Sequence, residues 1–288
     1  MHARYQTLAS GSAGNALLVQ LGDARLLVDA GLPFPVIAAR LAGAGVALSD
    51  LDAVLVSHEH ADHARALAEL RARHPAIPVL ATAGTARAAA RDLGVVLDGT
   101  LRPERALFVG GVAVVPFPVP HDAAEPVGFR IELGDFALAI ATDLGEVTPV
   151  VLRAFAGCRA VVVEANHDIE LLARGPYPPF LKRRIASRRG HLSNAQTADL
   201  LHAVAGPWLR HVTLAHASAT NNSPERALAA AAHALARQGH VEVLVAERDR
   251  TGTEVVLAID PRGRPAARFA ASPARDAGVR QLGLFDDR

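Results

Sequence analysis

The sequence predicts an α/β fold, in the broad sense that includes α+β arrangements, and three observations predict it. Of the 288 residues, 50% are hydrophobic and 20% are charged, which is a globular composition. The first half consists of short apolar runs bounded by turn residues, which is typical of strands. The second half alternates strand-like and helix-like segments more regularly. Hairpins and crossover connections are therefore mixed.

The elements follow in order along the chain. The predicted strands of the first half span residues 16–21, 25–29, 53–56, 78–81, 111–117, 127–133 and 136–141. The predicted helices between them span residues 35–42, 62–73 and 85–92. The alternating segments of the second half span residues 160–164, 194–205, 211–215, 224–237, 241–246 and 254–259.

Two segments depart from this rhythm. Residues 166–190 carry Gly-Pro and Pro-Pro steps and then a run of basic residues, which indicates an insert. From Pro261 onward the chain is rich in Pro, Ala and Arg without sustained periodicity. We therefore expect one catalytic domain over residues 1–260, with a basic insert at 166–190, and a flexible tail over 261–288.

Charge and cysteine content exclude several protein classes. Thirty Lys and Arg against 29 Asp and Glu give a net charge of +1, which excludes a histone-like basic protein. The single cysteine, Cys158, forms no intramolecular disulfide and excludes a cysteine-based zinc module. The N-terminal 15 residues hold no long apolar segment, and no run reaches the roughly 18 apolar residues of a membrane span. These features predict a soluble, cytoplasmic protein without a membrane partner.

The strongest chemical signal is the segment Ser57-His58-Glu59-His60-Ala61-Asp62-His63, between a predicted strand and a predicted helix. On an extended backbone His58 and His60 point to the same side, while Asp62 and His63 fall in the first helical turn. Imidazole and carboxylate ligands suit Zn, Fe or Mn, and two such ions can share an activated water. A merely solvated histidine-rich loop is the alternative.

Further candidate ligands close apolar strands later in the chain. His121 follows the strand at 111–117, Asp143 follows 136–141, and His216 follows 211–215. Each alone would more often be structural. Together they indicate convergence at one sheet edge.

This pattern, H-x-H-x-D-H followed by a strand-end His, a Thr-Asp-x-Gly and a late His, resembles the metallo-β-lactamase superfamily over roughly residues 5–260. The resemblance implies a four-layer αββα sandwich with a two-metal site at one sheet edge. It also implies how the ligands divide. One ion is held by His58, His60 and His121, the other by Asp62, His63 and His216, and Asp143 bridges both.

Shorter motifs resemble the YycJ/WalJ-type exonucleases within that superfamily. They are Ser10-Gly11-Ser12-Ala13-Gly14-Asn15, Val28-Asp29-Ala30-Gly31, His121-Asp122-Ala123 with Glu125-Pro126-Val127-Gly128, Glu164-Ala165-Asn166-His167-Asp168, Gly190-His191-Leu192-Ser193-Asn194, and Asn221-Asn222 after His216. The first would also suit an ordinary turn between strands. Ala217-Ser218 departs from the Leu-Ser that the family tends to show. The resemblance implies 5′-to-3′ exonuclease action on DNA, with a role in repair.

The expected reaction is attack on a phosphodiester by a metal-bound hydroxide, because two cations lower the pKa of a shared water. Asp62 orients that water. His191 or His167 would donate a proton to the leaving alkoxide, since both lie near turns and histidine titrates near neutral pH. A histidine packed over a helix start is the alternative for His191.

The basic residues of the insert are candidate phosphate contacts. They are Lys182, Arg183, Arg184, Arg188 and Arg189. A polynucleotide backbone would lie beside the flanking histidine motifs, which favours this interpretation over an ordinary solvated face.

Three functions stay open at this point. The leading hypothesis is a two-metal phosphodiesterase acting on DNA. The second is a small-molecule hydrolase of the same fold, such as a thioesterase, lactonase or cyclic-nucleotide phosphodiesterase, because metal-assisted attack serves carbonyl and phosphoryl centres alike. The third is a binding scaffold without activity, which the presence of all seven candidate ligands disfavours.

The C-terminus carries one more motif. Gln281, Leu282, Leu284 and Phe285 resemble the Gln-Leu-x-Leu-Phe peptides by which bacterial replication and repair proteins dock on the β sliding clamp. Gln281 would supply hydrogen bonds and the apolar residues would fill a pocket. Folding back onto the protein's own surface is the alternative.

Overall fold

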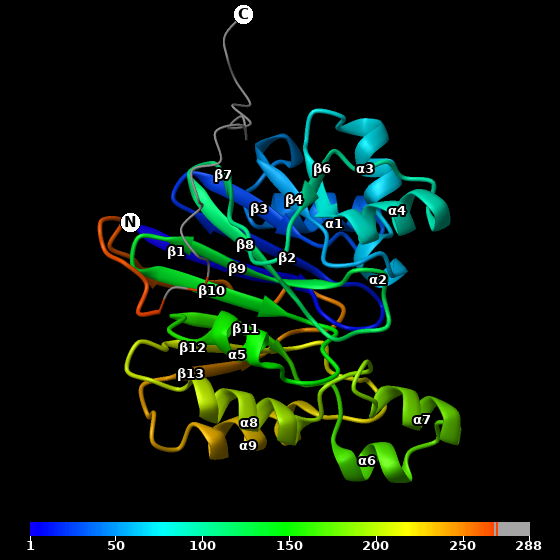
Figure 1. The fold of residues 1–288 in the computed structure, drawn as a ribbon, viewed down its shortest axis with the longest axis vertical. Helices are drawn as coiled ribbons and strands as arrows, with labels where there is room; N and C mark the ends of the chain where they lie inside the picture. Colours follow the sequence, from blue (N-terminus) through cyan, green and yellow to red (C-terminus); the bar gives the residue numbers. More distant parts are fainter. Residues whose placement is uncertain (268, 270–288) are drawn as a thin grey trace, which may run out of the picture.

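Two β-sheets of seven strands each lie face to face, and helices cover the outer faces (Figure 1). This computed structural model describes residues 1–267 and 269. The layers therefore follow the order αββα, as the resemblance implies. No helix in the described part of the chain is both long and apolar enough to cross a bilayer.

The first sheet has the strand order β14-β1-β2-β3-β4-β5-β6. Its strands are β1 (His2–Ala9), β2 (Ala16–Leu21), β3 (Ala24–Val28), β4 (Ala53–Leu55), β5 (Val79–Thr82), β6 (Gly99–Leu101) and β14 (Val255–Ala258). The pairs among β14, β1, β2 and β3 are antiparallel, and those from β3 to β6 are parallel.

The second sheet has the strand order β13-β12-β11-β10-β9-β8-β7. Its strands are β7 (Leu107–Val109), β8 (Val112–Pro118), β9 (Val127–Leu133), β10 (Phe136–Ala141), β11 (Ala160–Glu164), β12 (His211–Ala215) and β13 (Glu242–Val245). The pairs from β7 to β10 are antiparallel, and those from β10 to β13 are parallel. The prediction that hairpins and crossovers are mixed is confirmed.

The helices divide between the two faces. They are α1 (Phe34–Gly43), α2 (Ala61–Ala64), α3 (Leu67–Arg73), α4 (Ala83–Asp92), α5 (Pro149–Phe155), α6 (Ile169–Arg174), α7 (Pro179–Ile185), α8 (Asn194–Val204) and α9 (Pro224–Ala234). In Figure 1, α1, α3 and α4 lie beside the first sheet, whereas α5, α8 and α9 lie beside the second. α6 and α7 project at one end, beyond α8.

Three layers of apolar side chains hold these elements together. The central layer joins the two sheets and includes Leu26 and Phe129. A second layer seats α1 and α3 on the first sheet through residues such as Ile37. A third seats α5, α8 and α9 on the second sheet, with Leu200 among its members. The strands are apolar on both faces because both faces are covered.

Several elements differ from the sequence-based expectation. The predicted helix at 62–73 is two helices, α2 and α3, because the chain turns at Arg65 and Ala66 between them. The insert at 166–190 contains α6 and α7. β1 and α5 are elements that the apolar runs do not predict, although Ala3, Tyr5 and Thr7 of β1 are buried in alternation.

The chain stays packed on the body beyond Asp260, where the sequence places the end of the domain. Arg130, fully buried in β9, donates hydrogen bonds to the carbonyls of Ala154 and Ala156 at the end of α5 and to that of Ala267. The ring of Phe269 lies edge-on to Phe117, with 5.8 Å between ring centroids. One buried arginine therefore joins β9, α5 and the segment after β14.

Replacing Arg130 with methionine is expected to destabilise the fold by about 3 kcal/mol, because three carbonyls and the partly buried Glu132 carboxylate lose their donor. Thermal unfolding followed by circular dichroism would measure the loss. Arg153→Met is a matched control, since that arginine is exposed and its nearest carboxylate oxygen, on Glu104, is 3.7 Å away. Equal unfolding temperatures for the two variants would contradict the role of Arg130 in joining β9, α5 and the segment after β14.

Candidate metal centre

The candidate ligands lie at one edge of the sandwich because the strands that carry them run in the same direction within each sheet. In the first sheet, β3 is followed by Asp29 and β4 by the segment from His58 to His63. In the second sheet, β8, β10 and β12 are followed by His121, Asp143 and His216. The structure thus brings together all seven residues that the sequence indicated.

Three of the residues that follow these strands adopt the left-handed backbone conformation. The φ angles are 63° at Asp29, 57° at Asp143 and 52° at His216. A non-glycine residue in this region costs roughly 1 kcal/mol or more and persists where its surroundings impose it. The unfavourable turns direct the side chains across the sheet edge and into the site.

Tight packing beneath the cluster depends on one glycine. A Cβ built on Gly31 would lie 1.6 Å from the carbonyl oxygen of Asp62, so no side chain fits there. That same carbonyl accepts a hydrogen bond from the backbone N–H of Asn15, at 2.7 Å. Gly31 and Asn15 thereby set the position of Asp62 in the first turn of α2.

Three imidazoles form one group within the cluster. His58, His60 and His121 each offer a nitrogen within 4.8 Å of the others. The ring centroids of His58 and His60 are 4.6 Å apart, and each lies 5.2 Å from that of His121. This is the three-histidine set implied by the resemblance.

Carboxylates join the remaining residues. Asp143 Oδ2 lies 2.8 Å from His63 Nε2, and Asp143 Oδ1 lies 3.7 Å from His121 Nε2. Asp62 Oδ2 lies 3.6 Å from His63 Nε2 and 3.8 Å from His216 Nε2. Asp143 therefore contacts residues of both implied ligand sets, as a bridging ligand would.

Carboxylates behind the cluster orient several of its histidines. Asp29 lies 2.7 Å from His63 Nδ1. Glu164, fully buried at the end of β11, lies 2.7 Å from His191 Nδ1 and 3.1 Å from His216 Nδ1. An Nδ1–H donated to a carboxylate leaves Nε2 free as a ligand, which is the usual arrangement behind metal-bound histidines.

The Ser10–Asn15 loop is more than a turn. The Ser10 hydroxyl accepts a hydrogen bond from the backbone N–H of His216, at 2.8 Å. Asn15 Nδ2 lies 3.0 Å from His63 Nε2. The sequence singled out this loop, Asp29 and Glu164 within motifs without giving them roles. The role of Glu164 could have been predicted from the sequence, because Glu164 ends an apolar strand just as Asp143 follows one.

The donor atoms of the cluster fit a divalent cation. Nε2 of His58 and Nε2 of His216 are buried and have no hydrogen-bond partner among the described residues. Buried polar atoms without partners are rare in native proteins, and a cation would satisfy both. Histidine nitrogens and carboxylate oxygens together suit zinc, iron or manganese.

Burial and charge set the protonation of the cluster. Burial, with neighbouring His63, holds the pKa of His58 well below its usual value, so this imidazole is the neutral form that binds metals. Burial also opposes charge on His63, but the carboxylates of Asp143 and Asp29 prevail and raise its pKa well above the usual value. A cation entering the site would displace the proton on His63.

The two candidate proton donors lie in different surroundings. His191 lines the cleft beside the cluster, where Glu164 outweighs burial and raises the His191 pKa to about 9. His167 instead lines a separate groove between α6, α7 and α8, and burial lowers its pKa to about 4. Only His191, of these two, therefore borders the site.

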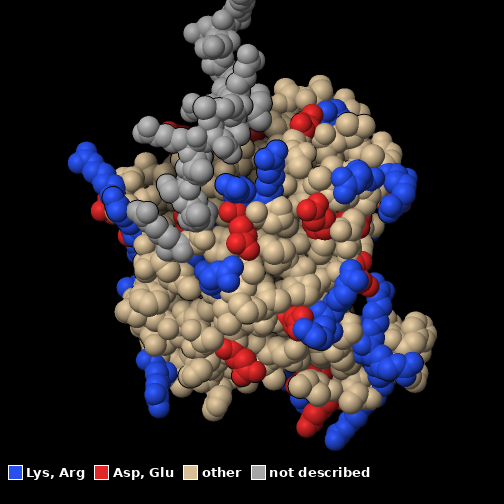
Figure 2. Space-filling view, viewed as in Figure 1, with Lys and Arg blue, Asp and Glu red and all other residues tan. Residues whose placement is uncertain are grey.

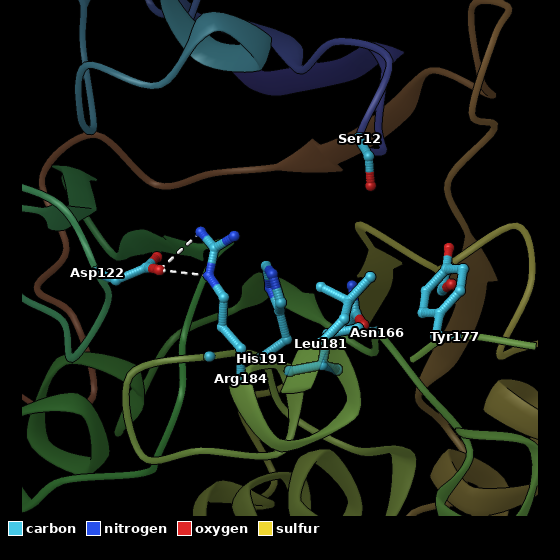
Figure 3. Close-up of a pocket in the computed structure, with 10 residues that line it drawn as sticks. Ser12, Asp122, Asn166, Tyr177, Leu181, Arg184 and His191 are labelled. Carbon is cyan, nitrogen blue, oxygen red and sulfur yellow. Dashed lines mark hydrogen bonds and ion pairs between the residues drawn. The ribbon is translucent and has the colours of Figure 1, made fainter. Parts of the chain in front are cut away.

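The cleft beside the cluster has a volume of about 210 Å³. Figure 3 shows Ser12 on one wall, Arg184 and Leu181 on another, and Tyr177 at the side. Arg184 Nη2 is 2.7 Å from Asp122 Oδ2, the ion pair drawn in the figure. A cationic side chain thus lies next to the histidine cluster.

Three of the other four basic residues of the insert contact the protein itself. Lys182 donates to the carbonyl of Ala173, and Arg189 donates to that of His121. Arg188 pairs with Glu146 at 2.7 Å. Arg183 is exposed and makes no ion pair or side-chain hydrogen bond within the described residues. The five residues that the sequence treats as equivalent therefore have different surroundings.

Comparison with known proteins agrees with this geometry. The family model described as a beta-lactamase superfamily domain matches residues 24–217. The chain belongs to the metallo-β-lactamase superfamily. A solved superfamily structure, the metallo-β-lactamase fold protein YhfI from Bacillus subtilis, has a TM-score of 0.70 at 18% identity, covering 89% of this chain and 99% of that one. The structure of human tRNase Z, short form, gives a TM-score of 0.59 at 15% identity over 89% and 99% of the two chains. Both likenesses concern the fold.

Two curated relatives within the superfamily share much more sequence. Exodeoxyribonuclease YycJ of Bacillus anthracis is 36% identical over 248 residues, covering 83% of this chain and 91% of the relative. Exodeoxyribonuclease WalJ of Streptococcus pneumoniae is 34% identical over 229 residues, covering 78% and 85%. The chain thus combines a hydrolase fold and a potential metal centre with relatives named as exodeoxyribonucleases.

Proposed function

We propose that this protein is a metal-dependent phosphodiesterase that degrades DNA from the 5′ end, with a role in DNA repair. The observation that carries the proposal is the cleft beside the histidine and carboxylate cluster, which Arg184 and His191 both line. Identity of 34–36% to exodeoxyribonucleases over about four fifths of the chain supports DNA as the substrate.

Two divalent ions, of zinc, manganese or iron, would be held by the seven residues that the sequence indicates. His58, His60 and His121 would hold one ion, Asp62, His63 and His216 the other, and Asp143 both. Bound there, the ions would lower the pKa of a water and withdraw charge from a phosphoryl oxygen. Asp62, half-buried at the sheet edge, would orient that water by accepting a hydrogen bond from it.

His191 is the residue that we assign to protonate the leaving alkoxide. Its Nδ1 is fixed on Glu164, and the ring lines the cleft, so Nε2 is left to face a substrate. His167 has no such position because it lines the separate groove. The leaving oxygen would receive the Nε2 proton as its bond to phosphorus breaks.

A panel of substrates decides between a nuclease and a small-molecule hydrolase. Labelled single-stranded and double-stranded DNA, RNA, a thioester and a lactone would be incubated with the metal-loaded protein. The proposal expects cleavage of DNA at rates at least a hundredfold above those of the thioester and lactone, an order that reflects specific contacts to the polynucleotide. Faster turnover of either small ester would favour the small-molecule hydrolase instead.

Arg184 is the insert residue that we expect to contact a scissile phosphate, since it lines the cleft. Arg184→Gln should weaken binding of single-stranded DNA and reduce the log–log salt slope by about 0.7, the value for one lost phosphate contact. Arg91→Gln is the matched control, because Arg91 is also an exposed arginine in an ion pair, with Asp92. An unchanged salt slope in Arg184→Gln would place the phosphate contact elsewhere.

The C-terminal residues Gln281, Leu282, Leu284 and Phe285 lie outside the described residues. We retain for them the proposed docking on a β sliding clamp, which would bring a repair nuclease to DNA. A peptide covering residues 277–288 should bind the clamp, and the same peptide with Leu284→Ala and Phe285→Ala should not. Absence of binding at tens of micromolar, where a known clamp peptide binds, would exclude this partner.

A further inference from the structure

Helix α7 separates the catalytic cleft from a second groove. Leu181, Arg184 and Ile185 line the cleft. Lys182, Arg183 and Ala186 line the groove, which has a volume of about 470 Å³ and continues to α6 and α8. At 3.6 residues per turn these two sets fall on opposite flanks of the helix. A chain that enters both spaces must therefore cross α7.

Phe180 lies on the exposed side of α7, between the two flanks. It lies three residues before Arg183 and four before Arg184, so all three share one helical face. Its side chain is 66% exposed. Of the other described phenylalanines only Phe108, at 58%, is also exposed, and it lies on β7 far from α7 (Figure 1). Phe180 therefore offers an exposed aromatic face next to two exposed arginines.

Charge indicates what could lie over this helix. α7 carries Lys182, Arg183 and Arg184 and no acidic residue. Figure 2 shows basic side chains gathered toward the end of the molecule where Figure 1 places α7, with acidic side chains beside some of them. Within α7, Arg184 pairs with Asp122, while Arg183 makes no ion pair among the described residues. Basic residues next to an exposed aromatic ring are the features by which proteins bind single-stranded nucleic acid, with phosphates on the cations and a base stacked on the ring.

The groove beyond α7 also contains a buried polar atom that has no hydrogen-bond partner among the described residues. His167 is 3% exposed, and its Nδ1 has no hydrogen-bond partner among the described residues. The remaining lining includes apolar residues such as Ile169 and Leu172, together with Gln196 and the carboxylate of Asp199. Such a lining suits a flat heterocycle with polar edges better than a phosphate.

We infer that α7 is a stacking ridge for a single-stranded polynucleotide: one base stacks on Phe180, Arg183 and Arg184 hold the flanking phosphates, and the neighbouring nucleotide enters the groove that His167 lines. This inference rests on the proposed function for its substrate class. It adds the path of the strand and a residue, Phe180, that binds a base. It also makes α7 a determinant of preference for single strands, because a base paired in a duplex cannot stack on the ring.

Binding of a hydrolysis-resistant strand tests the ridge separately from catalysis. The probe is a short phosphorothioate-linked single strand with a fluorescent label, and a second probe is the same strand with abasic sites. Anisotropy would be measured on the metal-loaded protein. Phe180→Ala should weaken binding of the ordinary strand about tenfold and that of the abasic strand less than about twofold. Phe180→Tyr should bind like the wild type.

Two further variants complete the design. Phe108→Ala, the matched control, should leave both affinities unchanged. Arg183→Gln should weaken both strands alike, since phosphates are present in each, and should lower the salt slope by about 0.7. Equal affinity of Phe180→Ala and wild type for the ordinary strand would overturn the ridge. The inference would also be overturned if Phe180→Ala weakened binding of the ordinary and the abasic strand equally, or if Phe108→Ala weakened binding as much as Phe180→Ala.

The inference and the proposed function fail in different ways. A wild-type protein that digests DNA while Phe180→Ala binds it normally would overturn the ridge and leave the nuclease. Binding that depends on Phe180, without any digestion of ordinary DNA, would support the ridge and contradict the nuclease. A wild-type protein that does not bind the strand would overturn both.

Discussion

Asp62→Ala is expected to lower DNA hydrolysis by about a thousandfold or more while leaving the protein folded. The Asp62 carboxylate lies between His63 Nε2 and His216 Nε2, so its loss removes both a candidate metal ligand and the group that orients the water. It is half-buried at the sheet edge, outside all three apolar layers, so the fold should survive. Turnover, bound metal and circular dichroism would be measured together.

Glu59→Gln is the matched control, because Glu59 lies three residues before Asp62 but accepts a hydrogen bond from the backbone N–H of Ala124 instead. It should retain most of the turnover and the bound metal. Wild-type turnover in purified Asp62→Ala would end the proposal that this cluster is catalytic.

His191→Gln should slow DNA hydrolysis by about 10² to 10⁴, the usual contribution of a positioned proton donor. The p-nitrophenyl ester of thymidine 5′-phosphate should be hydrolysed almost as fast as by the wild type, because p-nitrophenolate leaves without needing a proton. The difference between the two substrates separates proton donation from a structural role. His202→Gln is the control, because His202 is an exposed histidine on α8, and it should affect neither reaction. Equal losses on both substrates in His191→Gln would show that the residue acts through the cluster and not as a donor.

The cluster of candidate metal ligands could be predicted from the sequence because the positions of these residues follow from the strands. A polar residue that closes an apolar strand lies at a sheet edge, and strands that run in the same direction place such residues together. His121, Asp143 and His216 are far apart in the chain and were found in this way. The left-handed turns at Asp143 and His216 were not predictable, since neither residue type requires them.

The surroundings of the ligands depend on tertiary contacts that spacing does not encode. Glu164 reaches two histidines from different elements, His191 and His216, and only the packed sheet brings them together. The contacts of the basic insert could not be predicted from the sequence either. Composition marks it as a positively charged segment, but only the structure distinguishes Arg188, paired with Glu146, from Arg184 in the cleft.

Digestion of end-labelled single-stranded DNA with metal removal and add-back tests the central claim most directly. The metal-loaded protein should release the label of a 5′-labelled strand as a mononucleotide and shorten a 3′-labelled strand progressively. A chelator should abolish both reactions, manganese or zinc should restore them, and Asp62→Ala should show neither. Digestion that persists in chelator, or a metal-loaded protein that leaves both strands intact while hydrolysing a thioester or lactone, would contradict the account.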